Sequence, residues 1–287
     1  MASRTLVKPL SSAARDHLTQ LEKRWNGSIH LNMLSSPLRK CCVTSKVVPS
    51  ALMVLLKAVA LPPATPTAPP STSTPSSDPL SNKKLAQAGE GIVMLPDKLL
   101  HPKFVPPKLG KGIWVTLDSR IYSHLAKRGS WKISNPRAAL LEGMEELIWL
   151  QLGERVVQEC QLLVDRFGDK KRLDLISSCN PTAERVGYTI RLPTQQQGQG
   201  KQEESLSANP IFSPEFKDQR QKERFITAIH LLASIGNQSE QPSLNPKYGV
   251  KQSNITLPLG IALYRLHLWT HSLTTTVDDG KKQQSKA

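Results

Sequence analysis

Apolar residues recur at helical spacing in three stretches, and each stretch is expected to form a helix with one buried face. These stretches are 137–152, 214–235, and a last one that begins near 256–258 and contains LGIALYRLHLWTHSL. The first two follow Asn135-Pro136 and Ser213-Pro214. Such pairs favour a helix start, because the polar side chain caps free N–H groups and proline fits the first turn.

Strand patterns are fewer. Residues 186–192, VGYTIRL, alternate apolar and polar positions and predict a half-buried strand, while 112–117, GIWVTL, predict an interior strand. Residues 160–167, CQLLVDRF, fit either a helix or a strand. The expected fold class is α/β or α+β, with a small sheet, three or more amphipathic helices, and long disordered loops and tails.

The longest apolar run, 47–61, is expected to form a helix that opens at Pro49 and is closed by Pro62-Pro63. It spans 15 residues and contains both Lys57 and Pro49. A helix that crosses a bilayer needs about 20 apolar residues, so this run is too short and too interrupted to do so.

Proline content divides the chain, since seven prolines in residues 62–82 prevent both a helix and a packed core. We expect five regions: a transit-like segment, 1–30; a Ser-Pro-Leu-Arg turn with the apolar helix, 31–61; a proline-rich linker, 62–90; a mixed α/β body, 91–275, with mobile loops at 193–213 and 236–252; and a disordered tail, 276–287.

The chain is strongly basic. Thirty-eight Lys and Arg face 23 Asp and Glu, which gives a formal charge of +15 and a pI near 9.8. Such an excess indicates solubility, a polyanionic partner, or an organelle whose proteins are basic. The four cysteines show no CxxC spacing, which fits a reducing compartment rather than a disulfide framework.

The first twenty residues, MASRTLVKPLSSAARDHLTQ, contain arginine, serine and alanine but no acid before Asp16. This composition is typical of a mitochondrial transit segment. A flexible basic N-terminus of a cytosolic or nuclear protein is the alternative.

A basic segment rich in aromatic residues extends from Lys98 to Arg137, where nine Lys and Arg accompany the single acid Asp118. Its rings are Phe104, Trp114, Tyr122 and Trp131. Cations that meet phosphates and rings that stack on bases predict contact with RNA or DNA. The alternative is that the rings belong to the core and the cations surround an ordinary basic domain.

Motifs for catalysis or metal binding are not found. The segment around Gly200-Lys201 continues with Gln202, where a phosphate-binding loop needs Ser or Thr. His267 and His271 lie four residues apart but lack an adjacent acid or cysteine, and no GxSxG occurs. We therefore assign no catalytic, metal or cofactor residue, and we expect a protein that is not an enzyme.

The segment LSSPLRKCCVTSKVVPSALMVLLKAV, residues 34–59, resembles the fungal mitochondrial family called "required for respiratory growth protein 8". The similarity lies in a Leu-x-Ser-Pro-Leu/Met-Arg motif at 34–39, the basic stretch after it, the apolar segment 47–61, and the placement of ITLPLGIALYRLHLW. The resemblance implies a mitochondrial protein needed for maintenance and expression of the mitochondrial genome, and so for respiration. It implies no catalytic residue.

The leading hypothesis is a non-enzymatic factor of the mitochondrial matrix, without a membrane span, that contacts RNA or a ribonucleoprotein. The alternative is an assembly subunit of a mitochondrial complex that docks on a protein partner through 34–59 as a helix. The residues expected to contact nucleic acid or a partner are Ser36, Pro37, Arg39, Lys40, Lys46, Lys103, Lys108, Lys111, Arg120, Lys127, Arg128 and Lys132.

Overall fold

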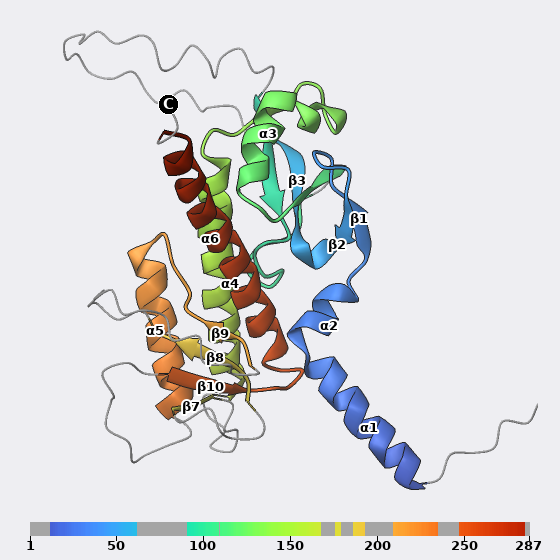
Figure 1. Cartoon of the computed structure of the whole chain (residues 1–287), viewed down its shortest axis with the longest axis vertical. Helices are drawn as coiled ribbons and strands as arrows, with labels where there is room; N and C mark the ends of the chain where they lie inside the picture. Colours follow the sequence, from blue (N-terminus) through green and yellow to red (C-terminus); the bar gives the residue numbers. More distant parts are fainter. Residues whose placement is uncertain are drawn as a thin grey trace, which may run out of the picture.

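Two long helices, α4 (Met144–Phe167) and α6 (Leu257–Gln284), lie against each other in the middle of the molecule (Figure 1). A computed structural model describes residues 12–61, 91–108, 110–167, 176–178, 186–192, 209–234 and 247–284. Buried side chains such as Leu152 and Leu266 join the two helices to one hydrophobic core. The chain is a mixed α/β protein, which confirms the predicted fold class.

The upper sheet in Figure 1 has the strand order β5-β3-β4-β6. Its strands are β3 (Met53–Ala60), β4 (Ile92–Asp97), β5 (Gly112–Thr116) and β6 (Ala139–Leu140). Strand β3 is antiparallel to both β4 and β5, and β6 is parallel to β4. A hairpin of β1 (Leu38–Lys40) and β2 (Val47–Pro49) and the helix α3 (Arg120–Arg128) complete this half.

The lower sheet has the order β7-β10-β8-β9. Its strands are β7 (Ile176–Ser178), β8 (Val186–Arg191), β9 (Ile211–Phe212) and β10 (Lys247–Lys251). Helix α5 (Gln219–Ser234) packs against α4 beside this sheet. The strands expected at 186–192 and 112–117 are therefore confirmed as β8 and β5.

The expected apolar helix at 49–61 is wrong. Residues 50–52 form one turn of 3₁₀ helix, and 53–60 form strand β3. Met53 to Leu56 are all buried, with exposed fractions from 0 to 7%. A strand covered on both faces shows a continuous apolar run, and its periodicity does not distinguish it from a buried helix.

Helix boundaries also differ from the expectation. Helix α4 begins at Met144 rather than 137, because residues 139–140 pair with β4, and it continues without a break through 160–167. The ambiguous segment CQLLVDRF is thus helical. Helix α5 begins at Gln219, five residues after the Pro214 that was expected to open it.

The expected loop 236–252 and tail 276–287 are only partly irregular. Residues 247–251 form β10, which lies between β7 and β8, and α6 extends through Gln284. The segments next to β10 in the sequence are polar and predict a loop. Its partner strands, β7 and β8, lie far away in the sequence, so local pattern does not predict this strand. The linker 62–90 and residues 193–208 and 235–246 lie outside the described residues.

The N-terminal part of the chain joins the body directly. Helix α1 (Ser12–Gly27) projects from the body in Figure 1, whereas α2 (Ile29–Leu34) buries Ile29 and Met33 in the core. A side chain at Gly260 would approach within 2.6 Å of the Ile29 Cδ1 atom. Strand β3 of the 31–61 segment pairs with β4 and β5, so this segment and the residues after the linker share one sheet.

Within the described parts of the chain, no helix combines the length and the apolar character that a bilayer span requires.

Replacement of Met33, which is 2% exposed, by Ala should lower the free energy of unfolding by about 2–5 kcal/mol, because it leaves a cavity between α2 and the core. The matched control Leu34→Ala lies on the same helix at 59% exposure and should change it by less than about 0.5 kcal/mol. Denaturant titration measures both. Equal effects would contradict the docking of α2.

Candidate nucleic-acid interface

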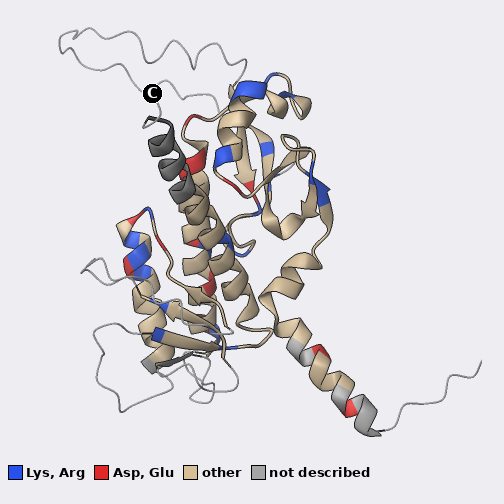
Figure 2. Ribbon diagram, in the orientation of Figure 1, with Lys and Arg blue, Asp and Glu red and all other residues tan. Residues whose placement is uncertain are grey.

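Most of the excess positive charge lies in the upper half of the molecule, which we call the basic lobe: residues 31–61 and 91–137. It contains thirteen Lys and Arg and two acids, a net charge of +11 out of +15 for the whole chain. Helix α4, by contrast, has five acids and two basic residues. Figure 2 shows Lys and Arg on the β1–β2 hairpin and around α3. Charge separation of this kind favours a polyanion at the lobe.

The hairpin lies against β5, so two basic segments that are distant in sequence become neighbours. The Cys42 N–H donates to the Trp114 carbonyl at 2.9 Å, and the Arg128 guanidinium donates to the Val43 carbonyl at 3.2 Å. The Arg39 guanidinium carbon lies 5.9 Å from the centroid of the Trp114 ring. This contact is a cation–π pair at the surface of the lobe.

Most cations expected at the interface are exposed. Eight of the ten have no carboxylate within ion-pair distance among the described residues: Arg39, Lys40, Lys46, Lys108, Lys111, Lys127, Arg128 and Lys132. Helix α3 ends at Arg128 and is capped by Gly129, whose φ of 63° is left-handed; Lys127 and Arg128 occupy its last turn. Cations are favourable there because they face the negative end of the helix dipole.

Two other expected cations are paired at the surface. Arg120 makes two contacts with Asp118, Nε to Oδ1 at 3.0 Å and Nη2 to Oδ2 at 2.8 Å. Lys103 lies 3.6 Å from Asp165, and both side chains are about half exposed. Exposed ion pairs contribute at most about 1 kcal/mol to stability, so replacing these carboxylates by phosphates as partners of the cations costs little free energy.

Ser36 and Pro37 support the turn before the hairpin. The Ser36 hydroxyl donates to the Met33 carbonyl at 2.7 Å and accepts from the Ala51 N–H at 3.0 Å, while the Pro37 carbonyl accepts from the Ser50 N–H at 2.9 Å. These bonds hold β1 beside β2 and so orient Arg39 and Lys40. Direct contact of Ser36 or Pro37 with a partner stays a prediction.

The aromatic residues of the basic segment occupy different environments. Tyr122 is 2% exposed and packs edge-on against Trp269, so its ring cannot stack on a base. Trp131 is half-buried and donates its indole N–H to the Ala138 carbonyl. Phe104 is 43% exposed, and Trp114 is half-buried beneath Arg39. Only Phe104 and the outer part of Trp114 suit base stacking.

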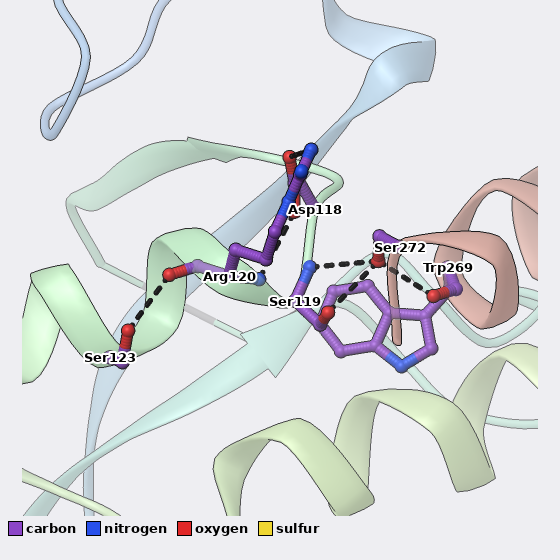
Figure 3. A network of polar contacts seen from close by, with 6 residues as sticks. All are labelled: Asp118, Ser119, Arg120, Ser123, Trp269 and Ser272. Atoms are coloured by element: carbon purple, nitrogen blue, oxygen red, sulfur yellow. Dashed lines mark hydrogen bonds and ion pairs between the residues drawn. The ribbon is translucent and has the colours of Figure 1, made fainter. Parts of the chain in front are cut away.

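A small polar network fixes α3 to α6 (Figure 3). The Ser272 hydroxyl lies 2.9 Å from the Ser119 hydroxyl, accepts from the Ser119 N–H at 3.1 Å, and donates to the Trp269 carbonyl at 2.7 Å. Ser119 and Ser272 are both buried. Because Asp118 and Arg120 flank Ser119, this network sets the position of the first turn of α3 and its ion pair.

A buried ion pair that sequence reasoning missed lies at the end of β4. Lys57 Nζ is 3.1 Å from Asp97 Oδ2, with side-chain exposures of 13% and 3%, and Lys57 also donates to the Lys108 carbonyl. The Lys108 N–H donates to Asp97 Oδ1 at 3.1 Å. Burial raises the pKa of Asp97, but the Lys108 N–H and Lys57 outweigh it and lower that pKa.

The adjacent cysteines are free thiols with different environments. Burial raises the pKa of Cys41, but hydrogen bonds with Thr116 and Thr44 outweigh it and lower the pKa to about 7. Burial, with the Cys41 charge, raises the pKa of Cys42 to about 11. Cys41 lies in the loop that joins β1 to β2, and its side chain is buried in the core.

Among the described residues, no group of three or more His, Cys, Asp or Glu is placed so that it could hold a metal ion. The rings of His267 and His271 are 6.0 Å apart on α6, and burial, followed by the charge of His271, lowers the pKa of His267. Two imidazoles without a third ligand do not form a metal site.

Comparisons with known proteins identify no relative: no family model, no curated protein and no solved structure matches this chain. The resemblance of residues 34–59 to the respiratory-growth family therefore stays a prediction.

Replacement of Asp97 by Asn should lower the free energy of unfolding at pH 7 by about 3–5 kcal/mol, because it leaves the Lys57 charge buried without a partner. The folded-state pKa of Asp97 is below its ordinary value of 3.8, so its contribution is present above that pH and is lost as the pH falls through the folded value. Denaturant titrations at neutral pH and below pH 4 measure the effect. The difference in unfolding free energy between the unmodified chain and Asp97→Asn should be smaller in acid.

The control is Asp118→Asn, which weakens the exposed pair with Arg120 and should cost less than about 1 kcal/mol. If both variants lost a similar amount of unfolding free energy, the result would contradict a buried Lys57–Asp97 pair that stabilises the fold.

Proposed function

We propose that the chain is a non-enzymatic factor that binds RNA, alone or in a ribonucleoprotein, through the basic lobe. The observation that carries the proposal is the meeting of two distant basic segments, which places Arg39 over Trp114 and Arg128 against the hairpin. Exposed cations that lie close together bind phosphates and release the counterions of the nucleic acid. The free energy of this counterion release dominates non-specific affinity for nucleic acid.

The available rings favour single-stranded RNA over a duplex. Phe104 is exposed on the loop before β5, and Trp114 already holds one guanidinium. Unpaired bases stack on such surfaces, whereas bases inside an A-form helix are inaccessible to side chains. The lobe therefore suits a flexible strand whose phosphates follow the cations.

The proposed place of action is the mitochondrial matrix, where the factor would serve maintenance or expression of the mitochondrial genome. Support comes from the acid-poor start of the chain, from the basic composition, and from the resemblance at 34–59. The described core begins at Ile29, so removal of residues before Trp25 would leave the packing of α2 and the Asn32 bonds to the Trp25 and Asn26 carbonyls in place.

A second candidate is an assembly subunit that uses the same region to contact a protein. Residues 53–56 are buried in β3, so they are not available as a docking helix. The exposed apolar positions nearby are Leu34, Leu38 and Val47, each about 60% exposed. They favour a partner with an apolar surface at the hairpin.

The triple variant Arg39→Gln, Lys40→Gln, Lys46→Gln should weaken binding of a single-stranded RNA by about tenfold or more at low salt. It should also reduce the slope of log affinity against log salt by about 2, because each phosphate contact on a single strand contributes roughly 0.7. Fluorescence anisotropy across a salt series measures both quantities.

The matched control removes three exposed cations outside the lobe, Arg191, Arg220 and Lys247, and should leave affinity and slope nearly unchanged. If the control lost as much RNA affinity as the lobe variant, binding would reflect only non-specific attraction by the net charge of the protein. Unchanged binding in the lobe variant, with one protein co-purifying in stoichiometric amount, would contradict the RNA role and favour the second candidate.

A full-length copy with a C-terminal fluorescent tag should co-localise with a mitochondrial matrix marker, and a copy with Arg4, Lys8 and Arg15 changed to Glu should not. Cationic positions drive import of transit segments, so this reversal tests the targeting sequence directly. A nuclear or cytosolic signal from the unmodified chain would overturn the mitochondrial proposal.

A further inference from the structure

A cavity of about 260 Å³ lies between the loop that follows β4 and the middle of α4. The loop contributes Lys98, Pro102, Val105 and Lys108, and α4 contributes Arg155. Asp97 forms part of the wall at the end of β4. Pockets for small molecules typically begin near 300 Å³, so this one suits a single compact ligand.

The charge of the cavity is positive. Asp97 is the acid in its wall; its Oδ2 lies 3.1 Å from the Lys57 ammonium, and its Oδ1 accepts from the Lys108 N–H at 3.1 Å. The Lys108 ammonium donates to the Pro96 carbonyl at 2.9 Å, which holds it at the cavity. Arg155 is bound by Glu159 at 2.7 Å through one nitrogen, Nη2, which leaves its other donors for a ligand.

Lys98 is held in an unusual backbone conformation. Its φ is 58°, in the left-handed region that residues other than glycine rarely adopt. Lys98 is exposed, and no carboxylate pairs with it among the described residues. Strained backbone concentrates at sites that bind ligands, and here it directs a cation to the cavity wall.

We propose that this cavity binds one nucleotide unit, a phosphate joined to a base, with the phosphate at Lys98, Lys108 and Arg155. Pro102 and Val105 supply an apolar wall against which a planar base packs. The identity of the anion rests on the proposed function, because Lys98 and Lys108 belong to the basic lobe and so connect the cavity to the path of an RNA strand. The unit is either the 5′ end of a strand or a free nucleotide.

Isothermal titration calorimetry of the full chain with adenosine 5′-monophosphate tests the proposal. Binding is expected, with adenosine and inorganic phosphate each binding at least tenfold more weakly, because each lacks one half of the recognised unit. Lys98→Gly should weaken binding about tenfold while it relieves the left-handed φ, so the protein stays folded. Val105→Trp should fill the cavity and abolish binding.

Lys247→Gln, which removes an exposed cation outside both the basic lobe and the cavity, is the control and should bind the nucleotide as the unmodified chain does. Preference for a 5′-phosphorylated over a 5′-hydroxyl oligonucleotide, lost in Val105→Trp, assigns the site to strand ends. Nucleotide binding without that preference assigns it to a free nucleotide.

The inference is overturned if adenosine 5′-monophosphate does not bind, if phosphate alone binds equally well, or if Lys98→Gly and Val105→Trp bind as tightly as the unmodified chain. Its failure is separate from that of the proposed function. Loss of RNA affinity in the Arg39, Lys40 and Lys46 variant tests the lobe alone, because none of these residues lines the cavity.

Discussion

The pairing of β3 with β4 on one side and β5 on the other is the interaction on which the rest of the structure depends. Four consecutive residues from Met53 are buried, so the strand contributes apolar surface to both faces of its sheet. Because β3 follows the hairpin and precedes residues 62–90, its pairing draws the N-terminal segment into the body. The Arg265 guanidinium strengthens this attachment by donating to the Met53 carbonyl at 2.9 Å from the central helix α6.

The distribution of charge follows from that arrangement. The hairpin is carried to the outer side of β5, where Arg39 meets Trp114, and α3 is fixed by the Ser119–Ser272 contact, which places Arg128 against the hairpin. Thirteen cations are thereby gathered on one half of the molecule. Repulsion among them opposes folding, and a polyanion that binds the folded lobe relieves it. The proposed RNA partner would therefore also stabilise the protein.

Lys57 connects the sheet to the cavity at its edge. It lies on β3, yet it neutralises Asp97 at the end of β4 and donates to the Lys108 carbonyl in the next loop. One buried ion pair thus shapes the loop that carries Lys98 and Lys108. Removing either charge would leave the other buried without a partner, which costs several kcal/mol.

Local pattern by itself determined the mixed α/β class, the strand β8, the existence of three long helices and the basic character of residues 98–137. Each of these depends on the spacing or composition of residues that are neighbours in the sequence, so the sequence alone is sufficient to predict it. Tertiary structure decided that 53–60 is a strand and that Tyr122 is buried, because both depend on partners far away in the chain. The Lys57–Asp97 pair and the contact of Arg39 with Trp114 join residues 40 and 75 positions apart, and only the pairing of β3 brings them together.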